Sequence, residues 1–195
     1  EKLFFCIGDV SGKGVPAAIV MACVHTMFRM AAAHEDNPAR IMLTINETSC
    51  EGNDANIFVT LFIGVLDLPT GRLRYCNAGH DRPIVIRSPL SPLPLGGAGG
   101  GSQAVGSLPV GLFADYKYTM EETTLDRHSM LFLYTDGLTE AMNRERRQFG
   151  LERVQQVIGA LNPQGSGVGI SPRQLVELMG REVAQFCHGV EQSDD

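Results

Sequence analysis

The sequence predicts a layered α+β fold with antiparallel sheets. Its predicted elements follow the order β-α-α-β-β-β-loop-β-β-α-α, so helices and strands occur in blocks instead of alternating. Regular alternation would favour a doubly wound parallel sheet instead. The chain has 195 residues, of which 44% are hydrophobic and 19% are charged. These values are typical of one globular domain with a core of ordinary size.

The first predicted elements are one strand and two helices. Residues 3–7 form an apolar run that is too short for a helix and stops at Gly8, which indicates a buried strand. Residues 16–33 are rich in Ala, Met and Val and begin with a proline, which is favoured in a first helical turn. This helix is apolar nearly all round, so we expect it to pack on several sides. Asn37 and Pro38 indicate the start of a second helix.

The middle of the chain is predicted to be β-structure. Residues 57–66 predict a long buried strand, and residues 67–71 predict a turn that contains Pro and Gly. Residues 72–76 alternate polar and apolar side chains, as a half-buried partner strand does, and residues 83–87 predict another strand. Residues 88–107 are rich in Pro, Gly and Ser and predict a flexible loop.

Two strands and two helices complete the predicted order. Residues 116–125 predict a mostly polar strand, and residues 130–134 predict a second apolar strand that leads towards an aspartate. Residues 150–161 predict a helix. The last helix is predicted over residues 171–188, where a serine and a proline provide the capping signal and apolar side chains recur at helical spacing.

Charge and cysteine usage exclude several classes of protein. The chain has 16 Lys and Arg against 22 Asp and Glu, a formal net charge of −6, which argues against a nucleic-acid partner. With Gly and Pro counted as interruptions, no stretch of about 18 uncharged apolar residues is expected to cross a membrane. The five cysteines are scattered and form no C-x-x-C pair, which favours a reducing cytoplasm over a disulfide framework or a zinc site.

Two aspartates share one local design. Asp9 and Asp136 each follow a predicted buried strand and stand at a glycine-containing turn. A carboxylate in that place is costly unless a cation meets it. Oxygen ligands without nearby His or Cys suit a hard ion such as Mg²⁺ or Mn²⁺. Each aspartate alone is more simply explained as a turn cap, but the matching pair favours a metal site.

Four motifs in register resemble one known family. They are IGDVSGKGVPAA at residues 7–18, FVTLFIGVLD at residues 58–67, NAGH at residues 77–80 and LYTDGLTEA at residues 133–141. In order and spacing they resemble the SpoIIE-like bacterial serine/threonine phosphatases, which are similar to the metal-dependent protein phosphatase 2C (PPM) family. The resemblance covers essentially the whole chain.

The resemblance implies a fold and a metal centre. It implies an antiparallel β-sandwich flanked by helices on both sides, in α-β-β-α layers, with two Mn²⁺ or Mg²⁺ ions at one end. Asp9 would bridge both ions, and the main-chain carbonyl of Val10 would bind one of them. Asp136 and Asp194 would ligate the other. A water that bridges the ions would attack the phosphate ester, so no protein nucleophile is needed. Lys13 would either contact the substrate phosphate or remain a solvated loop residue.

The sequence also departs from the family pattern. Many relatives carry a His, a candidate general acid, two residues after the bridging Asp; this chain has Ser11 there. His80 stands where eukaryotic relatives place an Asp that helps to hold a third ion, and a satisfied structural histidine is the simpler interpretation. We expect residues 1–195 to form a single phosphatase domain that lacks the family's first and last strands.

The sequence therefore predicts a metal-dependent protein serine/threonine phosphatase. Its expected substrate is a phosphoserine or phosphothreonine on a regulatory protein of the anti-anti-sigma-factor type, as in stress-response signalling, with a sensor or receiver domain upstream in the full-length chain. The oligomeric state is open, and a homodimer is one alternative. A non-catalytic module that keeps the fold and binds partners is the rival prediction. A hydrolase of small phosphate esters is a third.

Overall fold

The fold is described from a computed structural model, which covers residues 1–87, 91–95, 107–160 and 170–189. Its internal contacts divide the chain into two compact units. Unit 1 comprises Glu1–His80 and Gly99–Arg127, and unit 2 comprises Asp81–Ala98 and His128–Asp195. The single domain stays a prediction.

Unit 1 contains a four-stranded antiparallel sheet with the strand order β1-β2-β3-β6. The strands are β1 (Lys2–Val10), β2 (Val59–Asp67), β3 (Arg72–Ala78) and β6 (Glu121–Thr124). The apolar run of β2 is buried over most of its length, because β2 lies between two neighbouring strands and under helices. The sequence placed β1, β2 and β3 correctly to within a few residues, but β1 is partly exposed, so the prediction that it is buried was wrong. The polar strand expected over residues 116–125 is shorter, and only β6 pairs with β3.

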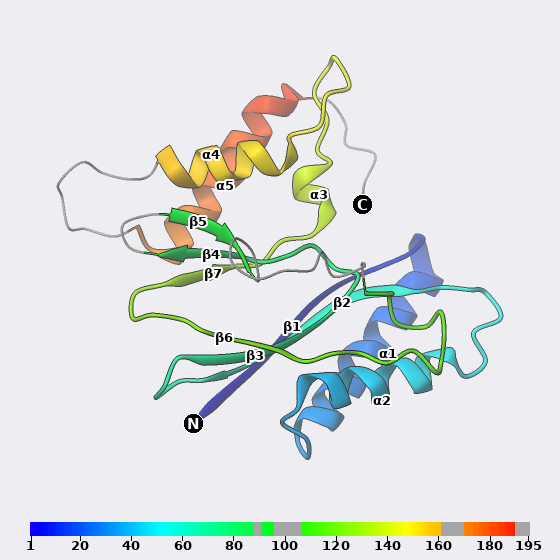
Figure 1. Ribbon diagram of the computed structural model, residues 1–195. Helices are drawn as coiled ribbons and strands as arrows, with labels where there is room; N and C mark the ends of the chain where they lie inside the picture. Colours follow the sequence, from blue (N-terminus) through cyan, green and yellow to red (C-terminus); the bar gives the residue numbers. More distant parts are fainter. Residues whose placement is uncertain (88–90, 96–106, 161–169, 190–195) are drawn as a thin grey trace. The chain divides into compact units, whose positions relative to one another are not determined.

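Helices α1 (Gly14–Ala32) and α2 (Pro38–Cys50) lie along the sheet of unit 1 (Figure 1). Asn37 caps α2, because its side chain accepts hydrogen bonds from the amides of Ala39 and Arg40. The core of the unit joins these helices to β1, β2 and β3. Its fully buried members include Ile41, Met42 and Ile45 on α2. Burial of this apolar face is what holds the helices on the sheet.

Helix α1 packs differently from what its composition predicted. Only Ala17, Val24 and Phe28 are buried, whereas Ile19 and Met30 are exposed. The expectation that α1 packs on several sides was wrong, because the unit supplies one sheet face and one neighbouring helix. By length and composition α1 could also cross a membrane, a test that core helices of globular proteins pass as well. The helix contains Arg29, so it is not the uncharged apolar stretch whose absence the sequence predicted.

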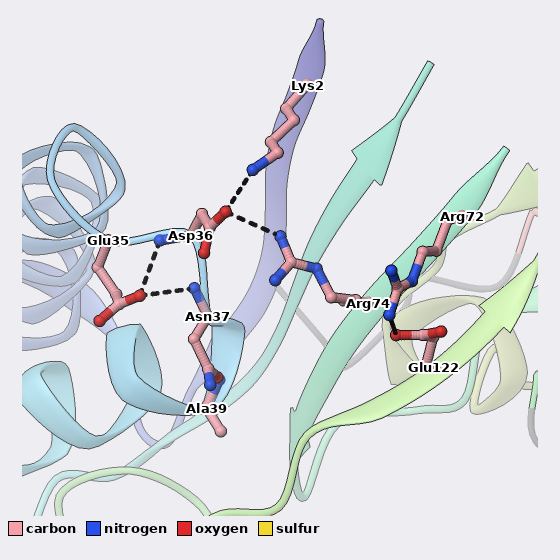
Figure 2. Close-up of polar contacts among 8 residues, drawn as sticks. All are labelled: Lys2, Glu35, Asp36, Asn37, Ala39, Arg72, Arg74 and Glu122. Carbon is pink, nitrogen blue, oxygen red and sulfur yellow. Dashed lines mark hydrogen bonds and ion pairs between the residues drawn. The ribbon is translucent and has the colours of Figure 1, made fainter. Parts of the chain in front are cut away.

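Asp36 ties the connection between α1 and α2 to the sheet (Figure 2). Its carboxylate pairs with Lys2 Nζ on β1, and Arg74 Nη2 on β3 lies 3.1 Å from Asp36 Oδ2. The hydrogen bond from Lys2 and then that from Arg74 lower the pKa of Asp36 to about 2. Next to it, Glu35 Oε1 accepts hydrogen bonds from the amides of Asp36 and Asn37 at 2.9 Å. Ion pairs of Asp36 thus attach the connection between α1 and α2 to strands β1 and β3.

The Asp36 contacts predict an acid-dependent loss of stability. Because the pKa of Asp36 is lower in the folded chain than its ordinary value of 3.8, its contribution is present above about pH 4 and is lost as the pH falls towards 2. The side chain is 46% exposed, so solvent screening limits the effect of Asp36→Asn to about 0.5–1 kcal/mol at pH 7. Urea unfolding of both proteins at pH 7 and pH 2.5 checks this. A difference that does not shrink at the lower pH would contradict it.

Unit 2 contains a three-stranded antiparallel sheet with the order β5-β4-β7. The strands are β4 (Ile84–Arg87), β5 (Ser91–Pro94) and β7 (Met130–Phe132), and the helices are α3 (Asp136–Thr139), α4 (Gly150–Ala160) and α5 (Pro172–Cys187). Figure 1 shows α4 beside β5 and α5. The core combines buried side chains from β4, α4 and α5, among them Ile84, Ile158 and Leu175. Ser171 and Gln174 form the predicted cap of α5 as a complete capping box.

Strand β5 falls inside the stretch that the sequence predicted as a flexible loop. Residues 91–94 pair with β4, so the loop prediction was wrong for them. Pro92 and Pro94 obscured this strand, because proline lacks an amide proton, but an edge strand tolerates proline. Residues 88–90 and 96–106 of the predicted loop lie outside the described residues, so their flexibility stays a prediction.

Candidate metal centre

Asp9 stands at the end of the first strand, as the sequence predicted. It pairs with Thr60 in the β1–β2 register, and Val10 pairs with Val59. Gly8 permits this close pairing, because a Cβ atom at Gly8 would lie 2.7 Å from the Thr60 carbonyl oxygen. The end of the strand is therefore fixed by the backbone of β2, and Asp9 is held where the ladder stops.

The Asp9 carboxylate accepts one hydrogen bond within the described residues and so keeps most of its lone pairs for other donors or a metal ion. The amide of Val10 donates a hydrogen bond to Asp9 Oδ1 at 2.8 Å, and within the described residues no Lys or Arg forms an ion pair with this carboxylate. The side chain is partly exposed. A carboxylate and main-chain carbonyls at one strand end are hard oxygen donors, so the chemistry of this donor set fits Mg²⁺ or Mn²⁺.

Two hydrogen bonds join the turn after Asp9 to Phe58, which directly precedes β2. Ser11 donates its amide proton to the Phe58 carbonyl at 2.8 Å, and its Oγ accepts a hydrogen bond from the Phe58 amide at 2.8 Å. Gly12 has φ +91° and Gly14 has φ +74°, a backbone that glycine adopts without strain. Lys13 lies between them, exposed, at the N-cap of α1. Ser11 thus shapes the turn through its hydroxyl.

Asp136 opens the short helix α3 in unit 2. The apolar strand β7 ends at Phe132, so residues 133–135 separate it from Asp136, which is exposed. The sequence predicted a strand that runs up to the Asp and a glycine turn, whereas the structure has a helical turn. Tyr134 beside it is buried, and burial together with the charge of Asp81 raises the pKa of Tyr134 to about 12. Its phenol therefore stays protonated at neutral pH.

The structure brings only part of the predicted ligand set together. Asp9 and Val10 are adjacent at the end of β1 in unit 1, Asp136 belongs to unit 2, and Asp194 lies outside the described residues. No group of three or more His, Cys, Asp or Glu side chains that could hold a metal ion gathers within the described part of the chain. The complete ligand set stays a prediction.

His80 is a buried and well-bonded histidine. It is 6% exposed, and Asn77 holds its backbone in both directions: Asn77 Nδ2 donates to the His80 carbonyl and Asn77 Oδ1 accepts from the His80 amide, each at 2.8 Å. Its Nδ1 lies 2.9 Å from Thr60 Oγ1. These contacts agree with the structural interpretation of His80 and lead to a residue that the sequence analysis missed.

That residue is Thr60. Its hydroxyl contacts His80 and also donates to the Asp9 main-chain oxygen at 3.4 Å. One sequence feature could have identified it, because Thr60 is the only side chain with a hydrogen-bonding group in the apolar run over residues 57–66. Its partners, however, lie 20 and 51 residues away in the sequence.

A family model and two relatives match this chain. The model described as Stage II sporulation protein E (SpoIIE) matches residues 1–195. Protein IcfG of Synechocystis sp. (strain ATCC 27184 / PCC 6803 / Kazusa) is 29% identical over 223 residues, which cover 100% of this chain and 33% of that protein. Phosphoserine phosphatase RsbU of Bacillus subtilis (strain 168) is 26% identical over 140 residues, 72% of this chain and 40% of RsbU. The chain thus spans less than half the length of either relative.

Solved structures share the fold. The RsbU and RsbW domains of Rv1364c from Mycobacterium tuberculosis match with a TM-score of 0.75 and 22% identity, over 100% of this chain and 49% of that one. The SiaA-PP2C domain of Pseudomonas aeruginosa matches with a TM-score of 0.74 and 18% identity, over 100% of this chain and 76% of that one. RsbX in complex with magnesium matches with a TM-score of 0.63 and 16% identity, over 95% of this chain and 74% of that one. These likenesses confirm the predicted α+β class with antiparallel sheets and its likeness to protein phosphatase 2C.

Proposed function

Because the chain belongs to the SpoIIE family, we propose that it is a metal-dependent protein serine/threonine phosphatase. The similarity to RsbU, which is named a phosphoserine phosphatase, supports this activity. The single observation that carries the proposal is the Asp9 carboxylate. It stands, partly buried, at the end of β1 and accepts one hydrogen bond, and within the described residues no cationic side chain neutralises it. A divalent ion is the partner that its chemistry calls for.

The proposed ligands follow the predicted set. Asp9, the Val10 carbonyl, Asp136 and Asp194 would hold two Mn²⁺ or Mg²⁺ ions, and the magnesium complex of the structural neighbour RsbX supports this class of metal. When bound, such ions supply an activated water and neutralise charge on the phosphoryl group.

The chain's own residues position the reacting groups. The β1–β2 ladder fixes Asp9, and Lys13 at the start of α1 would meet the substrate phosphate as a point charge. Ser11 would take no part in proton transfer, because an alcohol is a weak acid, and its Oγ serves to accept the Phe58 amide proton. The leaving group would then take its proton from water.

The proposed substrate is a phosphorylated regulatory protein of the anti-anti-sigma-factor type. The similarity to RsbU, and to a chain in which RsbU and RsbW domains occur together, supports this class. The greater length of the relatives is compatible with a sensor or receiver domain upstream. We also propose a cytoplasmic location. All five cysteines, each in the described part of the chain, are free thiols, as expected of a reducing compartment.

Mn²⁺-dependent turnover tests the proposed activity. We expect the chain to hydrolyse p-nitrophenyl phosphate and a phosphoserine protein with Mn²⁺ or Mg²⁺, and to lose this activity in EDTA, because the ions supply the chemistry. Release of inorganic phosphate is the measurement. Calorimetric titration with Mn²⁺ distinguishes the rival non-catalytic module, which need not bind metal. Turnover of the small ester alone would favour the third prediction, and no turnover of either substrate would contradict the proposal.

A further inference from the structure

A chain of hydrogen bonds leads from a buried histidine to the backbone of Asp9. His80 Nδ1 lies 2.9 Å from Thr60 Oγ1, and Thr60 Oγ1 donates to the Asp9 main-chain oxygen at 3.4 Å. All three residues belong to unit 1, on neighbouring strands β1 and β2 and directly after β3. The chain therefore spans three strands at the end of the sheet where the candidate site lies.

The direction of these bonds depends on the tautomer of His80. A threonine hydroxyl has one proton to donate. When Thr60 gives that proton to the Asp9 carbonyl, the tautomer of His80 that carries its proton on Nδ1 donates to Thr60 Oγ1. Asn77 holds the backbone of His80 on both sides, so the imidazole is presented to Thr60 from a rigid turn.

The Asp9 carbonyl shares its peptide group with the Val10 amide. That amide donates to Asp9 Oδ1 at 2.8 Å. One planar peptide group therefore accepts a hydrogen bond from Thr60 at its carbonyl end and donates one to the Asp9 carboxylate at its amide end. Rotation of this peptide would break both bonds together. A bond at the carbonyl end therefore restrains the direction of the carboxylate at the amide end.

We infer that Thr60, oriented by His80, is a positioning residue for the Asp9 carboxylate, acting through the Asp9–Val10 peptide. The inference rests on the proposed function in so far as this carboxylate holds a metal ion. The role resembles that of the outer-shell partners of metal ligands, whose replacement weakens metal binding without removing a ligand.

Thr60→Val removes the hydroxyl and keeps the shape of the side chain, and Thr60→Ser keeps the hydroxyl. Thr124→Val on the exposed strand β6 is the matched control. The first readout needs no metal: it is the hydrogen-exchange rate of the Val10 amide in metal-free protein. We expect exchange about 3- to 10-fold faster in Thr60→Val, and close to the wild-type rate in Thr60→Ser and Thr124→Val.

The second readout is Mn²⁺ affinity by calorimetric titration, alongside steady-state kinetics. We expect Thr60→Val to weaken Mn²⁺ binding about 10-fold and to lower kcat more than it raises KM, with recovery in Thr60→Ser. Unchanged Val10 exchange in Thr60→Val would overturn the inference, as would Mn²⁺ affinity equal to that of the wild type. If the wild type itself bound no Mn²⁺, the proposed function would fail, and Val10 exchange would still decide whether Thr60 positions Asp9.

Discussion

Replacement of Asp9 with asparagine is expected to lower the metal-dependent phosphatase activity by at least about 100-fold. Asparagine keeps the size of the side chain and one oxygen, but it removes the negative charge that the proposed metal centre needs. Loss of outer-shell partners alone typically costs about 10- to 100-fold in metal affinity or activity, so loss of a proposed metal ligand should cost more. Phosphate release from a phosphoserine protein at saturating Mn²⁺ is the measurement.

Asp54→Asn provides the matched control for this change. Asp54 is an exposed aspartate of the same unit, in the connection between α2 and β2, and it should tolerate the substitution with activity near that of the wild type. Thermal unfolding of both variants should show that they remain folded. Substantial activity in folded Asp9→Asn would remove Asp9 from the site and with it the main support for the proposed function.

The largest expected effect on stability comes from Asn46. This side chain is 0% exposed, and it bridges α2 to residues that follow 65 or more positions later. Its Nδ2 donates to the Phe113 carbonyl at 2.9 Å, and its Oδ1 accepts from the Gly111 amide at 3.0 Å and the Tyr118 hydroxyl at 3.2 Å. Each buried polar group left without its partner costs about 1–3 kcal/mol.

Asn46→Ala should therefore lower the free energy of unfolding by about 2–4 kcal/mol. The midpoint of urea unfolding, at an unchanged m-value, reports this loss. Glu47→Ala, on the next and exposed position of the same helix, should change the free energy by less than about 0.5 kcal/mol. Equal midpoints for the two variants would mean that the Asn46 bonds contribute little to the stability of the fold.

Prediction from sequence was reliable where a segment's structure depends on its own side chains. The apolar runs of β1 and β2 form strands, of which only β2 is mostly buried, and the caps Asn37 and Ser171 satisfy amides within three residues. Prediction was poorer where neighbours decide. β5 exists because β4 offers it an edge, and α1 exposes apolar side chains because only one of its faces meets the unit.

The candidate site shows the same division. The sequence by itself determined that Asp9 stands at the end of a strand, just before a glycine turn, because strand length and turn chemistry are local properties. Tertiary structure alone decided that Thr60 and His80 brace the backbone of Asp9, and that Asn46 holds Gly111 and Phe113. These partners lie between 20 and 67 residues apart in the sequence. Thr60, His80 and Asp9 meet only once the β1–β2–β3 register is set, and that register is fixed by the buried faces of the sheet.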